Sequence, residues 1–183
     1  MERDPKSEYF VLRQTVAARG TARPILALCG FGIWAAVLTA VLVLLPYPAA
    51  ASIPLMLLVV SFEVIRPLHF GAERIGRYIQ VFHEEAGEPN RPLSETPSWE
   101  RVAMSFGAVP GVGGHPLFVP MFLFATAINY LAVLLPAPVA IELGVMAIPH
   151  LAFIGWLVTS DRAMRNQRAI ELVRMRELKN APR

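Results

Sequence analysis

The chain has 183 residues, of which 55% are hydrophobic and only 17% are charged, and its net charge at pH 7 is +3. The charged fraction lies well below the ~25% of an ordinary soluble domain. No charged residue lies between Pro24 and Phe62, and only Glu142 is charged within 102–160. Apolar stretches of this length exclude an ordinary soluble domain and predict an integral membrane protein. Because the basic residues flank these stretches, a membrane explains the basic charge and we expect no nucleic-acid partner.

The N-terminal segment, 1–23, is basic and carries a weak apolar stripe. It predicts either a short helix lying at the membrane interface or a frayed tail. The first transmembrane hairpin follows over 24–66. Its two spans are joined by the turn Pro46-Tyr47-Pro48, and Pro67 predicts a kink or break after the second span.

The central region, 67–116, is polar and divides in two. Ile75, Tyr78, Ile79 and Phe82 recur at helical spacing, which predicts an amphipathic helix over about 72–86 that lies along the membrane. The remainder is rich in proline and glycine and reads as an exposed loop.

The second transmembrane hairpin covers 117–160, with spans at Leu117–Leu135 and Val139–Thr159, and a basic tail occupies 161–183. The predicted fold is therefore an all-α integral membrane protein with four transmembrane helices in two hairpins, plus a cytoplasmic interfacial amphipathic helix. Every Lys and Arg lies in 1–23, 67–116 or the tail, apart from Arg66 at the end of the second span. The positive-inside rule then places both termini and the central region in the cytoplasm of a cell (plasma) membrane.

A cluster of charged residues where the second span leaves the apolar stretch is the predicted interaction surface. Arginines and glutamates are interleaved in it, which favours a protein partner or a bound polar ligand over attraction to anionic lipid alone. They are Glu63, Arg66, His69, Glu73, Arg74 and Arg77. His69 and Glu73 are also four residues apart on one helical face, but two ligands make a weak metal signal, and an interfacial charge network is the simpler interpretation.

The polar residues expected at membrane depth are Asn129, His150 and, near a turn, Glu142. Ionisable groups at this depth are functional candidates because their burial is costly. The alternative for His150 is a hydrogen bond to Asn129 or to the carbonyl that Pro149 frees one turn earlier.

Three function classes remain open from these residues. The first is an accessory or scaffold subunit of a membrane assembly, which would bind a membrane-protein partner or form a homo-oligomer. The second is a small homo-oligomeric transporter or channel with Asn129 and His150 in its pathway. The third is a membrane redox or metal enzyme, with no cofactor identified. The sequence carries no motif for nucleophilic or metal-dependent hydrolysis, which argues against an enzyme.

Overall fold

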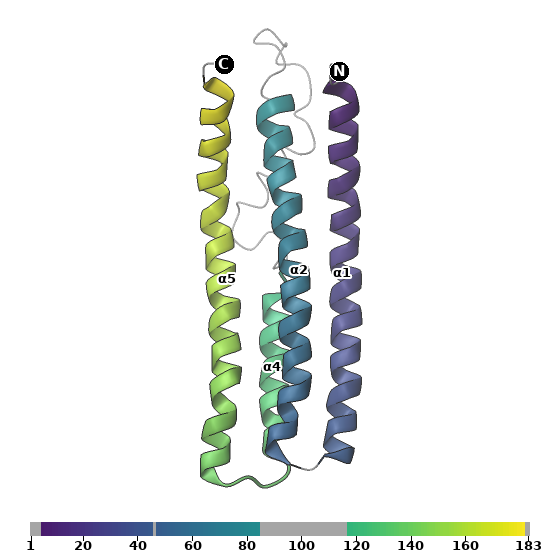
Figure 1. Cartoon of the computed structure of the whole chain (residues 1–183), viewed down its shortest axis with the longest axis vertical. Coiled ribbons are helices and arrows are strands. Elements are labelled where there is room, and N and C mark those ends of the chain that lie inside the picture. Colours follow the sequence, from purple (N-terminus) through teal and green to yellow (C-terminus); the bar gives the residue numbers. More distant parts are fainter. Residues whose placement is uncertain (1–4, 46, 85–116, 182–183) are drawn as a thin grey trace.

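The computed structural model describes residues 5–45, 47–84 and 117–181. Within these residues every regular element is a helix. In chain order they are α1 (Pro5–Leu44), the 3₁₀ turn η1 (Pro48–Ala51), α2 (Ser52–Tyr78), the π-helical turn η2 (Ile79–Glu84), α4 (Val119–Val133) and α5 (Ala140–Asn180). The start of α1 and the end of α5 lie at the same end of the bundle (Figure 1). The all-α prediction is therefore confirmed.

Three helical segments are long and apolar enough to cross a membrane: Ser7–Leu44, Pro48–His83 and Ala140–Asn180. α4 has only 15 residues, which corresponds to about 22 Å at 1.5 Å per residue, against a hydrocarbon layer of about 30 Å. The third predicted span is therefore shorter than expected. It begins after Phe118, whose backbone is left-handed with φ of 54°, and it ends at Val133.

Two helices continue where the sequence predicts a boundary. α1 runs through Pro24, so the N-terminal segment is part of a helix of 40 residues and not a separate interfacial helix. α2 runs through Pro67 to Tyr78 and passes directly into η2. The amphipathic segment predicted over 72–86 is thus, as far as Glu84, the continuation of α2. Tertiary contacts on both sides of Pro67 explain this, because packing overrides the local preference for a break.

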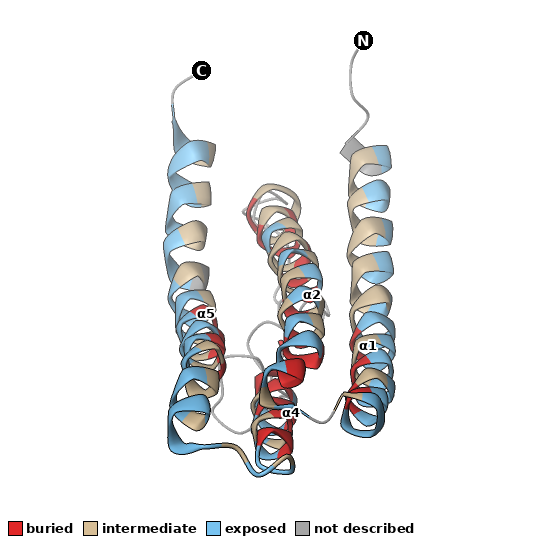
Figure 2. Ribbon diagram, turned by 60° about the horizontal axis from the view of Figure 1, so that its bottom comes forward, coloured by how far each residue is buried: buried red, intermediate tan, exposed pale blue. Residues whose placement is uncertain are grey.

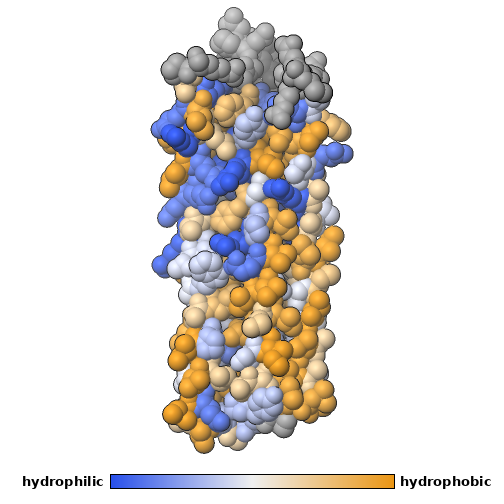
Figure 3. Space-filling model, viewed as in Figure 1, coloured by the Kyte–Doolittle hydropathy of each residue, from blue (hydrophilic) through white to orange (hydrophobic). Residues whose placement is uncertain are grey.

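The bundle divides along its length into two halves. In the apolar half, residues 24–62 and 117–160, α4 fills the space beside α1, α2 and α5 (Figure 1). In the charged half, residues 5–23, 63–84 and 161–181, α2 lies between α1 and α5. Figure 3 shows hydrophobic residues dominating the lower surface and hydrophilic residues gathering on the upper surface. Residues 85–116, which include the predicted loop, lie outside the described residues.

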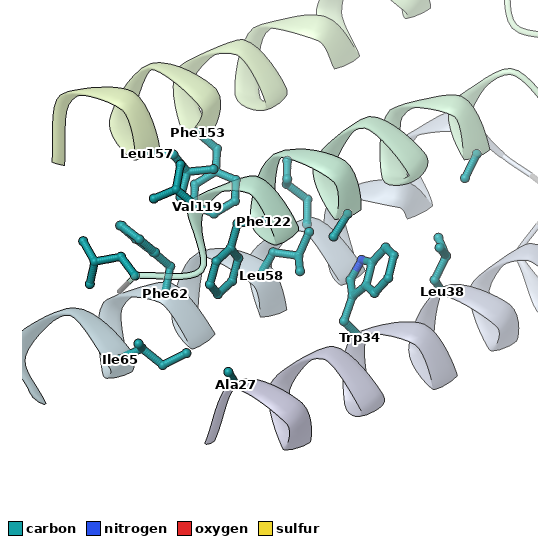
Figure 4. Close-up of a cluster of buried hydrophobic side chains, with 14 residues drawn as sticks. Ala27, Trp34, Leu38, Leu58, Phe62, Ile65, Val119, Phe122, Phe153 and Leu157 are labelled. Atoms are coloured by element: carbon teal, nitrogen blue, oxygen red, sulfur yellow. The ribbon is translucent and has the colours of Figure 1, made fainter. Parts of the chain in front are cut away.

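The core lies where α4 meets the other helices, and the buried residues gather there (Figure 2). Phe62 of α2 and Phe122 of α4 contact edge to face with ring centroids 5.4 Å apart, and Phe153 of α5 lies 6.2 Å from Phe62 (Figure 4). Trp34 and Leu38 bring α1 into the same cluster. Each helix thus contributes large apolar side chains to one core, which fixes the relative positions of the polar residues described next.

Candidate functional site

A layer of ion pairs joins α2 to α5 in the charged half. Arg77 donates to Glu171 from Nη2 at 2.6 Å and from Nε at 3.0 Å, and its Nη1 donates to Glu73 at 2.8 Å. Arg74 donates to the other oxygen of Glu171 at 2.9 Å, and Gln167 adds a bond of 2.6 Å to that oxygen. Burial alone would raise the pKa of Glu171, but the bonds from Arg74, Gln167 and Arg77 outweigh it and lower that pKa.

A second contact in the charged half joins α1 to α2 through a buried histidine. Arg23 of α1 contacts Nδ1 of His69, and Nε2 of His69 lies 3.8 Å from a carboxylate oxygen of Glu73. Burial, together with the nearby charges of Arg23 and Arg77, lowers the pKa of His69 to about 4 against the attraction of Glu73. His69 is therefore neutral at pH 7, and its Nδ1 accepts a hydrogen bond from the Arg23 guanidinium.

A glycine on α2 makes room for another arginine of α1. A Cβ atom built on Gly71 would clash with the guanidinium of Arg19. The Arg19 guanidinium therefore occupies the space that a side chain at position 71 would fill. The positive side chains of Arg19 and Arg23 are both turned toward α2.

At the boundary between the two halves, α2 and α5 are joined by an aromatic contact. Glu63 accepts hydrogen bonds from Trp156 Nε1 at 2.7 Å and from Arg66 at 2.9 Å. The Arg66 guanidinium lies 5.0 Å from the centroid of the Trp156 ring, which is a cation–π contact. An indole ring in this position is typical of a membrane–water interface.

The structure therefore brings all of the predicted interaction residues into contacts within the chain. His69 and Arg77 are buried, at 4% and 2% exposure, so they lie beneath the surface and not on it. The Arg74 side chain is 63% exposed, and those of Glu63, Arg66 and Glu73 are about one-third exposed. Contact of this group with a partner stays a prediction, and only its exposed members are available for it.

A polar network in the apolar half joins α1, η1, α4 and α5. Asn129 of α4 is fully buried; its Nδ2 donates to the Ala51 carbonyl at 2.9 Å and to His150 Nε2 at 3.0 Å. Its Oδ1 accepts from Trp34 Nε1 at 3.3 Å, and His150 Nδ1 donates to the Met146 carbonyl at 2.7 Å. Every donor and acceptor of these two side chains is used once, so the network requires a neutral His150 with its proton on Nδ1.

Glu142 has a local role at the start of α5. Its carboxylate accepts the backbone N–H of Val139 at 3.0 Å, as an acidic residue in a first helical turn often does. It also lines an open hollow of about 340 Å³ beside Tyr47. A smaller cavity of about 110 Å³ between α1, η1 and α4 has no charged residue in its lining. Both lie at the end of the bundle where the helices are connected.

The metal interpretation gains no further ligand from the structure. Among the described residues no three His, Cys, Asp or Glu side chains gather as a metal site would require. His69 lies in the charged half and His150 in the apolar half, so these two imidazoles do not face each other.

Sequence reasoning missed the partners that complete these contacts, namely Arg23, Trp34, Trp156 and Glu171. Each is distant in sequence from the residue that it contacts, and α1 and α5 both run antiparallel to α2. Glu171 is one of three acidic residues in the mainly basic tail, and nothing in its spacing distinguishes it from Asp161 and Glu177. Comparisons with protein-family models, with curated proteins and with solved structures find no match.

Proposed function

We propose that the chain is an integral membrane protein that acts as an accessory or scaffold subunit of a membrane assembly. In this proposal the apolar half lies in the bilayer, with α4 completing the four-span arrangement, and the charged half projects from it as a stalk. The Lys and Arg residues are confined to the stalk side, which supports a cytoplasmic stalk with both termini inside and the two proline turns outside. The predicted localisation is the plasma membrane.

The observation that carries this proposal is that polar groups are fully hydrogen-bonded within the chain in the apolar half but not in the described part of the stalk. Asn129 and His150 use all their hydrogen-bonding groups within the chain, so they offer nothing to a passing ion or solute. In the stalk, by contrast, buried polar atoms without a hydrogen-bond partner remain among the described residues, including Gln80 Oε1, His83 Nε2 and Asp161 Oδ1. The described part of the stalk thus contains polar groups whose hydrogen bonds the chain does not supply, unlike Asn129 and His150.

The shape of the stalk also supports a scaffold. The 20 residues from Asp161 to Asn180 continue α5 without interruption, and a helix of that length spans about 30 Å. Ion pairs from Arg74 and Arg77 of α2 to Glu171 hold this segment against α2. A rigid rod of this kind can hold a binding surface at a fixed height above the membrane.

The transporter and enzyme alternatives have no comparable support. Transport requires polar groups that converge at mid-membrane and remain free to bind a substrate. The Asn129–His150 network is instead saturated, and the larger hollow is open at one end of the bundle only.

Cysteine labelling tests the orientation. In a Cys29→Ala background, we expect Tyr47→Cys to react with a membrane-impermeant maleimide only from outside intact cells. Asn166→Cys, an exposed position on the stalk part of α5, is the matched control and should react only after the membrane is opened. Labelling of Tyr47→Cys from the cytoplasmic side would contradict the topology.

Purification in mild detergent with mass spectrometry of bound proteins tests the subunit role. We expect a specific membrane protein to copurify with the wild-type chain and to be lost from Arg74→Glu. Arg174→Glu is the matched control, because Arg174 is also an exposed arginine paired with a glutamate, at 69% against 63% side-chain exposure. A preparation that contains this chain alone, or equal loss of the partner from both variants, would contradict the proposal.

A further inference from the structure

The larger hollow at the end of the bundle where the helices are connected has the form of a small-molecule site. It lies between η1 and the start of α5, and its volume of about 340 Å³ falls within the ~300–1,000 Å³ of such sites. Its polar side-chain groups are the carboxylate of Glu142 and the hydroxyl of Tyr47. The apolar lining residues are Pro48, Ala49, Ile141, Val145 and Met146. An apolar wall with a few polar groups is the arrangement that orients a ligand.

Glu142 is the only formally charged residue within 24–62 and 117–160. One oxygen of its carboxylate accepts the Val139 N–H, and no other hydrogen bond or ion pair reaches this carboxylate within the part of the chain that the structure describes. Every Lys and Arg lies outside these two ranges, so the apolar half supplies no cation for it. The exposed carboxylate therefore attracts a cation into the hollow and repels an anion.

Tyr47 supplies the second polar group of the hollow. The residue is half exposed, and among the described residues its hydroxyl has no hydrogen-bond partner. A phenol can donate a hydrogen bond to a phosphate oxygen, and the face of its ring attracts an ammonium group. Together, Glu142 and Tyr47 complement a molecule that carries an ammonium group and a phosphate close together.

The apolar wall continues from the hollow along α5. Ile141, Val145 and Ile148 are four and three residues apart, so they lie on one face of the helix, and each is at least half exposed. A small soluble cation would use the carboxylate of Glu142 but not this wall. A molecule with a hydrocarbon chain can cover the wall and place its polar end at Glu142.

The position of the hollow selects a phospholipid among such molecules. With the apolar half in the bilayer, this end of the bundle lies at the outer membrane surface, where lipid headgroups surround it. A headgroup with a primary ammonium donates N–H bonds to a carboxylate, whereas a trimethylammonium headgroup has no N–H to donate. An anionic headgroup lacks the cation, and the apolar half has no Lys or Arg to bind it. Phosphatidylethanolamine therefore fits the hollow best.

We propose that the larger hollow binds the headgroup of phosphatidylethanolamine, with its ammonium group at Glu142, its phosphate at the Tyr47 hydroxyl and an acyl chain along the apolar wall. Glu142 then has two roles, because one oxygen accepts the Val139 N–H and the other accepts from the lipid. The inference rests on the proposed insertion of the apolar half into the bilayer. It does not depend on the subunit role, which is tested at Arg74 in the stalk.

Native mass spectrometry of the full chain in mild detergent tests the headgroup. With phosphatidylethanolamine, phosphatidylcholine and phosphatidylglycerol of the same acyl chains added separately in equal amounts, we expect the first to give the most lipid adduct. Glu142→Gln keeps an oxygen for the Val139 N–H but removes the charge, so we expect about tenfold less adduct, as the loss of one hydrogen bond between charged groups would give. Glu177→Gln changes an exposed glutamate of α5 in the stalk and is the matched control, which should bind as the wild type does. Equal adducts with all three lipids, an unchanged adduct in Glu142→Gln, or equal loss in both variants would overturn the proposal.

Filling the hollow gives a second test that alters no charge. Ala49→Leu enlarges an exposed lining residue, and we expect it to lower the lipid adduct to the level of Glu142→Gln while the melting temperature stays unchanged. Ala36→Leu is the matched control, because Ala36 is exposed on α1 in the apolar half and lines neither the hollow nor the smaller cavity. Unchanged binding in Ala49→Leu would contradict the inference. A wild-type chain that inserts with Tyr47 outside but shows no preference for phosphatidylethanolamine would also overturn it, and would leave the proposed function standing.

Discussion

Arg77 is the residue whose loss should weaken the stalk most. Its side chain is only 3% exposed, and it makes two bonds to Glu171, at 2.6 and 3.0 Å, and one to Glu73, at 2.8 Å. Arg77→Met keeps most of the side-chain volume and removes these three charge-assisted bonds. The substitution therefore reports on the ion pairs between α2 and α5 with little change in packing.

The expected loss follows from what remains around the two carboxylates. Removing one partner of a buried ion pair costs about 3–5 kcal/mol because the other charge is left buried. Glu171 keeps its bonds to Arg74 and Gln167, and the Glu73 side chain is 35% exposed. We therefore expect the lower end of this range, about 3 kcal/mol in the free energy of unfolding. For Arg74→Met, whose side chain is 63% exposed, we expect less than about 1 kcal/mol.

The assay is reversible unfolding in a mild detergent for both single variants, for Glu171→Met and for the double variant Arg77→Met/Glu171→Met. The double-variant cycle should give a coupling energy of about 2 kcal/mol between the two residues. Hydrogen exchange should increase in 161–180 of Arg77→Met and stay unchanged in α4. Equal losses for Arg74→Met and Arg77→Met, or a coupling energy near zero, would refute the view that this layer holds α5 to α2.

Three further predictions concern single residues. The pKa of His69 is about 4 in the folded chain against 6.5 ordinarily, so the unfolded chain binds more protons between these pH values. The free energy of unfolding should therefore fall as the pH drops below 6.5, by about 2 kcal/mol at pH 5. The variant His69→Gln should lack this part of the pH dependence. Asn129→Leu leaves its hydrogen-bond partners on α1, η1 and α5 unsatisfied, and it should cost about 2 kcal/mol in unfolding experiments, whereas Asn166→Leu on the stalk surface should cost almost nothing. A Cβ on Gly30 would lie 2.6 Å from the Ser61 hydroxyl of α2. Gly30→Ala should therefore lower the melting temperature by an amount equivalent to about 1–2 kcal/mol. Gly155→Ala, at an open position, should leave the melting temperature unchanged or raise it.

The helical character and the limits of the apolar stretches could be predicted from the sequence because they depend on local composition. Tyr47 and Pro48 lie in the connection between α1 and α2, where the sequence predicts the turn of the first hairpin. The partnership between His150 and Asn129 was one of the alternatives available from the sequence, and the structure shows that bond. His150 also bonds to the carbonyl of Met146, which is not the carbonyl that Pro149 frees.

The behaviour of the prolines could not be predicted in this way. Pro24, Pro67 and Pro149 all lie inside continuous helices. A proline removes one backbone hydrogen bond and bends the helix, and whether the helix ends there depends on the contacts on either side. Ile65 and His69, on the two sides of Pro67, are both buried in the bundle. That information is tertiary, so a boundary assigned from proline alone is unreliable in a bundle of long helices.

The orientation of α1 shows why the candidate site was only partly predictable. Reading a helix by composition assumes that its charged face points to water, and this places Arg19 and Arg23 outside. The structure turns both toward α2, because α2 offers Gly71 as space and the neutral His69 as an acceptor. Neither feature is visible as a motif, since they lie 52 and 46 residues away along the chain (71 − 19 and 69 − 23). Once the arginines face inward, uncharged residues such as Val11, Gln14 and Ala18 face outward. The inward arginines and the uncharged outward side of α1 are thus one consequence of how α1 packs on α2.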